Sequence, residues 1–216
     1  MINDPAVEGQ YRDLQSIAAQ LDGIPIHWVP GNHDIAADFL APTPASLSWY
    51  RERFGPDYGA FEHDGTVLIS LNSVVLDHPE HVGDELDAQM TFLETTLRDA
   101  QRQRSRHVIL FGHHPLFTAD PSEEDTYWNI PSARRGEILD MFHAFGATSY
   151  FCGHWHRNGG GRDRDLEVVV TGPVGYPLGA DPSGFRIVEV SDEAIAHRYV
   201  ALDAAAAVPA AGGGSM

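Results

Sequence analysis

Residues 107–115 read His-Val-Ile-Leu-Phe-Gly-His-His-Pro, an apolar run that ends in a glycine and two histidines. β-branched and aromatic residues favour extended structure, and a short apolar run bounded by glycine and proline is typical of a buried strand. We therefore predict a strand over 107–111 that delivers Gly112, His113 and His114 at its carboxyl end. Loops at such strand ends commonly carry chemistry.

The same arrangement recurs twice elsewhere in the chain. Residues 24–29 form a short apolar run before Gly31-Asn32-His33-Asp34, and Thr148–Cys152 precedes Gly153-His154-Trp155-His156. Each polar cluster is expected in a loop at the carboxyl end of a strand. Glycine lets the backbone turn sharply where a strand delivers a side chain. The sequence therefore predicts three strand ends that share one site.

The remaining pattern alternates helices with strands early in the chain and pairs strands late. Spacing, caps and turn residues predict helices over 7–21, 44–54, 84–104 and 132–145, a hairpin of 58–61 with 67–71, a strand over 166–171 and a hairpin of 185–190 with 195–200. This order indicates one layered α/β domain over residues 1–203 rather than a purely parallel sheet. The Ala/Gly-rich residues 204–216 are expected to be a disordered tail.

The composition restricts the expected partners and compartment. The 216 residues include 14 Lys+Arg against 31 Asp+Glu, and the net charge of −17 opposes binding to a polyphosphate backbone, so no nucleic acid is expected. No run approaches the roughly 18 apolar residues of a membrane helix, so no membrane partner is expected. The single Cys152 cannot form an internal disulfide, which favours a reducing, cytoplasmic compartment.

The polar side chains at the three strand ends suit metal binding. Neutral imidazole is a common ligand of zinc, iron and manganese. His154 and His156 are expected to point the same way, because side chains of an extended strand alternate. Each motif has an ordinary alternative: Asn-His-Asp is often a turn, His-His-Pro a capped strand end, and His-x-His a surface pair. The three together, in order and each after an apolar run, favour a shared metal site.

This ordered set resembles the calcineurin-like phosphoesterase superfamily. The motifs of that family run Asp-x-His, Gly-Asp, Gly-Asn-His-Asp/Glu, Gly-His and Gly-His-x-His. The last three are present at residues 31–34, 112–113 and 153–156. The resemblance covers Met1 to about Asp203 and is greatest to the protein-phosphatase branch of the family. Three stretches carry that similarity, at residues 111–117, 153–158 and 178–182.

The resemblance implies a dinuclear metal centre and gives roles to several residues. It makes Asn32, His113 and His154 ligands of one metal ion. It makes His156 a ligand of the other. His33 would be the acid that faces the leaving group. Asp34 occupies the acidic position beside that histidine, where a carboxylate helps to keep an imidazole protonated.

The implied reaction is hydrolysis of a phosphomonoester, in a small molecule or a phosphoprotein. The nucleophile would be a hydroxide that bridges two divalent or mixed-valence ions of manganese, iron or zinc. The implied fold is a layered β-sandwich flanked by helices. No Asp-x-His and no Gly-Asp precede Gly31, so we expect Met1 to be an internal start or the beginning of a fragment that lacks the first strands.

Two other functions are compatible with these motifs. One is a phosphodiesterase for cyclic nucleotides or other diesters, because the same metal cage serves both reactions. The other is a catalytically impaired binding scaffold, because upstream metal ligands of the family pattern are missing.

Each of three smaller features also has two interpretations. Residues 120–125 form an acidic loop that is either simply solvated or, with Tyr127-Trp128-Asn129 next to it, part of the substrate cleft. His114 lies beside a predicted ligand and could bind metal or not. Gly159–Gly161 is interpreted as a flexible turn, which could let the backbone approach phosphate.

Overall fold

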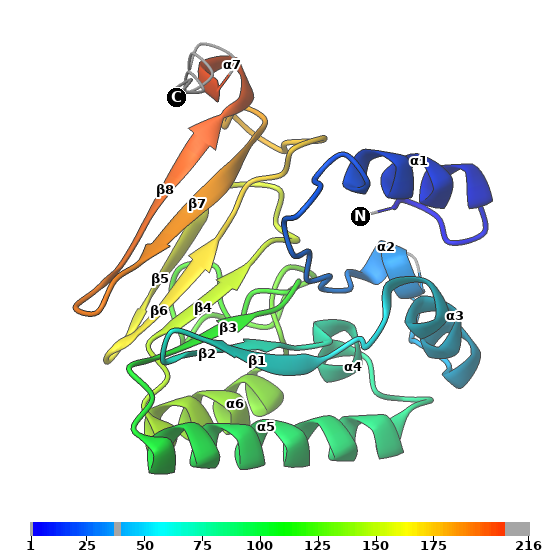
Figure 1. The fold of residues 1–216 in the computed structure, drawn as a ribbon. Coiled ribbons are helices and arrows are strands. Elements are labelled where there is room, and N and C mark those ends of the chain that lie inside the picture. The colour runs from blue at the N-terminus through cyan, green and yellow to red at the C-terminus, as the bar shows by residue number, and fades with distance from the viewer. Residues whose placement is uncertain (1, 37–39, 206–216) are drawn as a thin grey trace.

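A computed structural model describes residues 2–36 and 40–205, and its centre is a six-stranded mixed sheet (Figure 1). The strands are β1 Gly59–His63, β2 Thr66–Ser70, β3 His107–Phe111, β4 Ser149–Cys152, β5 Gly159–Asp163 and β6 Leu166–Val170. Their order across the sheet is β1-β2-β3-β4-β6-β5. The four inner strands are parallel and the two edge strands are antiparallel. The carboxyl ends of the inner strands therefore lie along one edge.

Two long helices cover one face of the sheet. α5 (Gly83–Gln103) connects β2 to β3, α6 (Ser132–Phe145) connects β3 to β4, and the two lie beside each other in Figure 1. In α5, Leu86, Leu93 and Leu97 are buried along one side at helical spacing. Burial of these side chains against the apolar strand residues forms the main core.

A two-stranded hairpin packs on the other face. β7 (Gly184–Val190) and β8 (Ile195–Ala201) pair in antiparallel register. Val188 and Ile195 of this hairpin pack on a second, smaller core that includes Phe151 of β4. The hairpin, the six-stranded sheet and the helices form three layers (Figure 1), which confirms the predicted layered α/β fold with helices beside the sheets.

The N-terminal helices pack beside the sheet. α1 (Glu8–Ala18) contacts α3 (Pro44–Phe54) through Tyr11 and Phe54, whose rings meet edge to face at 5.5 Å between centroids. Thr43 caps α3, because its hydroxyl accepts a backbone N–H of the first turn at 3.1 Å. Three shorter helices are α2 Asn32–Ile35, α4 Ser73–Asp77 and α7 Leu202–Ala205. Within the described ranges, no helix combines the length and the apolarity that crossing a membrane requires.

The predicted strand over residues 24–29 is wrong. This stretch has irregular backbone, with Ile24 61% and Ile26 37% exposed. A strand requires a neighbour that satisfies its backbone hydrogen bonds, and an apolar pattern does not show whether that neighbour exists. Here His27 makes a side-chain contact with β1 instead, because its ring stacks on Phe61 at 3.8 Å between centroids.

Two predicted loops are regular structure. The expected loop after residues 24–29 is the single helical turn α2, and the expected flexible turn at Gly159–Gly161 is the start of β5. Gly160 has a φ of 117°, and a Cβ there would overlap the backbone of Val168 in β6. Glycine is therefore required because two strands approach closely. Of the predicted tail, residues 204 and 205 belong to α7, and residues 206–216 lie outside the described part.

A buried polar network supports the loop that follows β2. The side-chain oxygen of Asn72 accepts the N–H groups of Val74 and Val75 at 3.2 and 3.3 Å, and its Nδ2 donates to Asp57 at 2.8 Å. The backbone N–H of Asn72 donates to Oε1 of Gln89 at 2.7 Å, and Nε2 of Gln89 donates to the backbone carbonyl of Asn72 at 3.1 Å. Asn72 is fully buried, so water cannot replace these partners.

Replacing Asn72 with alanine is expected to lower the free energy of unfolding by about 2–4 kcal/mol, because buried donors and acceptors would lose their partners. Urea denaturation followed by circular dichroism measures the effect. Gln103→Ala, at the exposed end of α5, is the control and should change stability by less than about 0.5 kcal/mol. Equal effects of the two substitutions would show that the network does not support the loop.

Candidate metal centre and active site

One cavity brings together all six side chains to which the resemblance gives a role. Its volume is about 630 Å³. The six residues are Asn32, His33, Asp34, His113, His154 and His156. The loops after β3 and β4 supply the last three, and α2 brings the first three to the same edge of the sheet (Figure 1). Three segments that are distant in sequence therefore meet at one site, although only two of them follow strands.

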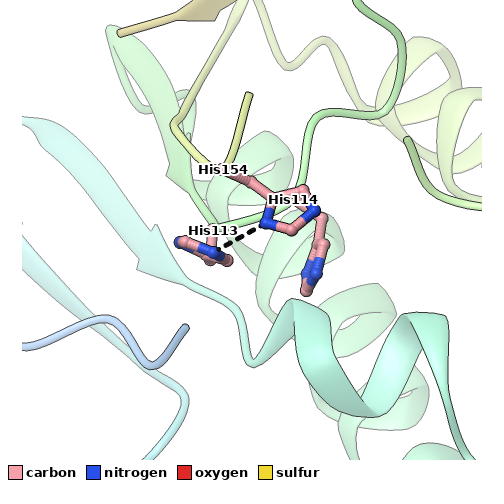
Figure 2. Close-up of side chains that lie close together, drawn as sticks. All are labelled: His113, His114 and His154. Carbon is pink, nitrogen blue, oxygen red and sulfur yellow. Dashed lines mark hydrogen bonds between the residues drawn. The ribbon is translucent and has the colours of Figure 1, made fainter. Parts of the chain in front are cut away.

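Three of these side chains bring their ligand atoms into contact. The Nε2 atom of His113 lies 2.9 Å from Oδ1 of Asn32 and 3.1 Å from Nδ1 of His154, the contact dashed in Figure 2. Asn32 and His154 are 7% and 6% exposed, so the cluster is shielded from water. An amide oxygen and two imidazole nitrogens that converge in this way suit a transition metal ion. The residues present therefore fit the first of the two implied metal ions.

Tyr127 orients two of the three ligand groups. Its carbonyl oxygen accepts the Nε2–H of His154 at 3.0 Å, which assigns the tautomer whose Nδ1 lone pair faces His113. The Nδ2 group of Asn32 donates to the Tyr127 hydroxyl at 3.4 Å, so that Oδ1 faces His113. Histidines that bind metal are commonly held through their second ring nitrogen in this manner. The cluster is thus oriented for a cation.

The glycines of two motifs provide space for the site. A Cβ at Gly31 would approach Nδ1 of His113 to 2.9 Å, and a Cβ at Gly112 would overlap the hydroxyl of Tyr150. Neither glycine has a positive φ. Neither therefore adopts a left-handed backbone, and the predicted sharp turn does not by itself require glycine at these positions. Glycine is required here because rings of other segments approach the backbone closely.

His154 and His156 have a left-handed backbone conformation. Their φ angles are 61° and 56°, in a turn that follows β4 rather than in an extended strand. The two side chains do line the same cavity, as predicted. The alternation of side chains along a strand is not the reason, because these residues are not in a strand. A left-handed non-glycine residue costs on the order of 1 kcal/mol or more and is concentrated at functional sites.

His114 supports the cluster from a neighbouring position. His113, His114 and His154 each contribute one ring nitrogen to a cluster (Figure 2). These three nitrogens lie within 4.8 Å of one another. The hydroxyl oxygen of Ser73 accepts the backbone N–H groups of His113 and His114 at 3.0 and 2.8 Å, so its own O–H donates to Nδ1 of His114 at 3.0 Å. The other ring nitrogen faces Asp77, 3.8 Å away. Because Ser73 holds Nδ1 of His114, this nitrogen serves to position the ring rather than to bind metal.

Carbonyl groups orient the rings of His33 and His156. The Nδ1–H of His33 donates to the carbonyl of Asn3 at 2.9 Å, and the Nδ1–H of His156 donates to the carbonyl of Tyr176 at 2.6 Å. In a neutral ring with this tautomer, Nε2 carries the lone pair. Each ring can therefore present an acceptor nitrogen, for a proton at His33 and for a metal ion at His156.

Asp34 fixes the segment that carries Asn32 and His33. Its Oδ1 accepts the backbone N–H of Ile2 at 2.8 Å and its Oδ2 accepts that of Gly31 at 2.9 Å. The residue is 1% exposed, so these hydrogen bonds are protected from water and stabilise α2. The implied influence of Asp34 on the proton of His33 stays a prediction.

Burial keeps the imidazoles of His113 and His114 neutral. Burial, reinforced by repulsion from neighbouring histidines, lowers the pKa of both groups well below the usual range. The unfolded chain takes up these protons near pH 6.5, roughly the ordinary pKa of histidine, whereas the folded chain takes them up only at lower pH. Acid therefore favours the unfolded state.

The metal-free protein is accordingly expected to lose up to about 1.4 kcal/mol of stability per pH unit and per histidine below about pH 6.5. Burial raises the pKa of Asp77 to about 6, which opposes this loss at lower pH. Thermal unfolding in EDTA should therefore be compared between about pH 7.5 and about pH 6. His114→Gln should make the pH dependence less steep, and an unchanged dependence would contradict the prediction.

Sequence reasoning missed the roles of Ser73 and Tyr127. Ser73 follows the end of β2, and the polar pair Asn72-Ser73 after an apolar run is the same signal that indicated the other strand ends. The signal was overlooked because neither residue is a typical metal ligand. Tyr127 gave only a weak signal as a possible border of the cleft, because its carbonyl group, not its side chain, orients His154.

The family can be assigned on this fold and site. The sequence profile of the family described as Calcineurin-like phosphoesterase matches residues 3–158, a range that holds all six residues of the site. The chain belongs to the calcineurin-like phosphoesterase family.

Known proteins of this family resemble the chain to different degrees. It is 37% identical over 204 residues to a serine/threonine-protein phosphatase CPPED1 of Danio rerio, which is 94% of this chain and 65% of that relative. The chain thus spans less than two thirds of the length of this relative.

Two solved structures share the fold. One is GAP50, the anchor in the inner membrane complex of Plasmodium, with a TM-score of 0.64 at 16% identity over 92% of this chain and 69% of that one. The other is a dimetal phosphatase from Danio rerio, with a TM-score of 0.52 at 17% identity over 92% of this chain and 75% of that one.

Proposed function

We propose that this chain carries the metal-binding and catalytic core of a phosphoesterase that hydrolyses phosphomonoesters, phosphoserine and phosphothreonine in proteins among them. The observation that carries the proposal is the contact of His113 with both Asn32 and His154, two buried side chains that line one cavity. Membership of the family and similarity to a serine/threonine-protein phosphatase support it.

The ligand atoms suggest how two metal ions would be held. Asn32, His113 and His154 would bind one ion, and Nε2 of His156 would contribute to the other. Manganese, iron and zinc all suit imidazole and amide ligands. Bound ions would make a nucleophile from water at neutral pH and neutralise charge on the phosphate.

The remaining residues orient the substrate and handle a proton. His33 would deliver a proton from Nε2 to the leaving oxygen, while the Asn3 carbonyl accepts Nδ1–H and so orients the ring. Asp34 keeps the backbone of this segment in place. All 14 basic side chains lie among the described residues, and none of them lines the cavity. Phosphate binding would therefore depend on imidazoles and bound cations.

Hydrolysis of p-nitrophenyl phosphate and of its bis-ester, with Mn²⁺ present, tests the proposal. The monoester is expected to be hydrolysed at least about tenfold faster than the bis-ester. This ratio corresponds to a difference of about 1.4 kcal/mol between the two activation free energies. EDTA should abolish the reaction, and a phosphothreonine peptide should release phosphate. Faster cleavage of the bis-ester would support a phosphodiesterase instead. Binding of Mn²⁺ without hydrolysis of any of these esters would support a binding scaffold.

A further inference from the structure

The cavity has an apolar wall next to its ligand cluster. Six of its lining residues are aromatic or aliphatic: Ile2, Tyr127, Trp128, Pro173, Tyr176 and Leu178. Ring centroids of Tyr127 and Trp128 lie 4.8 and 5.6 Å from that of His154, and the Tyr176 centroid lies 6.2 Å from that of His156. Three aromatic rings, here called the aromatic wall, therefore adjoin histidines of both proposed metal positions.

The aromatic wall is accessible from solvent. Tyr127 is 37% and Tyr176 is 71% exposed, although burial of an aromatic ring is favourable. A group of exposed aromatic side chains around a cavity is typical of a recognition site, since such rings provide contact area at a low entropic cost. The side chain of Tyr176 is not needed for the position of His156, because the contact is made by the carbonyl group.

Hydrogen bonds hold both loops that carry the aromatic wall. The N–H of Leu178 donates to the carbonyl of His156 at 2.9 Å, and the carboxylate of Asp181 accepts the N–H of Asn158, just after the His-x-His motif, at 2.7 Å. In the other loop, the carboxylate of Glu123 accepts from the Asn129 amide at 2.7 Å. A wall that is already ordered binds an apolar group without the entropic cost of ordering the loops.

The charge of the cavity and of the protein restricts the ligand. No arginine lines the cavity, the sequence has no lysine, and the net charge is −17. A second phosphate or an acidic neighbour would meet no compensating side chain and would be repelled by the whole molecule. An apolar group beside a single phosphate would instead displace water from the aromatic wall.

We infer that Tyr127, Trp128 and Tyr176 form a specificity subsite for an aromatic or aliphatic side chain next to the phosphorylated residue of a phosphopeptide. The inference rests on the proposed phosphomonoesterase function. With the phosphate at the histidine cluster, a neighbouring peptide side chain reaches these rings, because their centroids lie 4.8–6.2 Å from those of His154 and His156, a distance that about two extended residues span. A nucleoside monophosphate offers the same pairing of a phosphate with a planar apolar group, so the experiment has to distinguish the two sources.

Fluorescence anisotropy of labelled phosphoserine peptides, with the Mn²⁺-loaded chain, measures the preference. A peptide with phenylalanine beside phosphoserine is expected to bind roughly tenfold more tightly than one with glycine there, from burial of an aromatic ring. Tyr176→Ala and Trp128→Ala should each remove a large part of this difference and leave the glycine peptide unaffected. Tyr176→Phe should retain it, and Phe185→Ala, an exposed ring on β7, is the matched control.

Each outcome separates the subsite from the proposed reaction. Equal binding of the two peptides, or variants that weaken both peptides alike, would overturn the subsite even if the chain hydrolyses phosphomonoesters. Adenosine monophosphate is therefore compared with inorganic phosphate as a competitor of the labelled peptide. Stronger displacement by adenosine monophosphate would assign the aromatic wall to a nucleobase and overturn the proposal that the subsite takes a phosphopeptide side chain. Preferential binding of the phenylalanine peptide without any hydrolysis would support the subsite and contradict the proposed reaction.

Discussion

Replacement of His113 by alanine is expected to reduce the affinity for Mn²⁺ by at least about 100-fold. Removing a residue that only hydrogen-bonds a metal-binding histidine already lowers metal affinity about 10–100-fold, and removing the histidine itself should cost more. His113 has this large effect because its Nε2 atom is the common neighbour of Asn32 Oδ1 and His154 Nδ1. Alanine removes one of three ligand atoms and leaves a space between the other two. The two remaining groups would then bind a cation weakly.

Isothermal titration with Mn²⁺ measures this loss of affinity. His33→Asn is the informative comparison, because His33 lines the same cavity but is assigned to proton transfer. This variant should bind Mn²⁺ within about threefold of the unchanged protein, a difference below 1 kcal/mol. His63→Ala, at the exposed end of β1, controls for loss of any imidazole. Unchanged affinity of His113→Ala would show that the cation binds elsewhere.

Much of the fold could be predicted because its local signals agree with its packing. The strand over 107–111 and the helix over 132–145 form where the sequence predicts them. The turn at Asp64-Gly65 has positive φ at both residues, as a two-residue hairpin turn requires. In each case a local residue pattern agrees with the burial or the backbone conformation of its own segment, so no information about distant segments is needed.

The candidate ligand residues could be selected from sequence for a different reason. Each motif places histidine or asparagine directly after an apolar run, and parallel strands such as β3 and β4 bring their carboxyl ends to one edge. The residues that orient these ligands could not be selected in this way. Ser73 acts through hydrogen bonds to the backbone of two histidines, and Tyr127 acts largely through its carbonyl group. Backbone contacts between distant segments leave no residue type that reveals them.

The errors also have a common physical cause. A strand over 24–29 depends on a pairing partner, and the helical turn α2 depends on Asp34, whose carboxylate bonds the N–H of Gly31. The direction of His154 and His156 depends on a left-handed turn that strand periodicity does not describe. None of these features follows from the periodicity of its own segment, so local patterns predict the presence of the site better than its geometry.

Gly112→Ala is expected to lower the free energy of unfolding by about 3 kcal/mol or more, because a well-packed interior tolerates an added carbon poorly. A Cβ at this position would overlap the hydroxyl of Tyr150 and would lie 2.8 Å from its Cζ atom. Tyr150 is fully buried and its hydroxyl donates to the carbonyl of His114 at 2.8 Å. The ring therefore has no space to move without breaking a contact of the histidine loop.

A double-mutant cycle in urea identifies the cause of this loss. Tyr150→Phe alone should cost about 1–2 kcal/mol, because the His114 carbonyl loses a buried donor. Combined with Gly112→Ala it should cost about 1 kcal/mol less than the sum of the single changes, since the overlapping oxygen is gone. Gly136→Ala, an exposed position of α6 with no atom within 4 Å of a new Cβ, should instead stabilise by about 0.5–1 kcal/mol. Additive costs in the cycle would mean that the overlap with Tyr150 is not the reason why residue 112 is glycine.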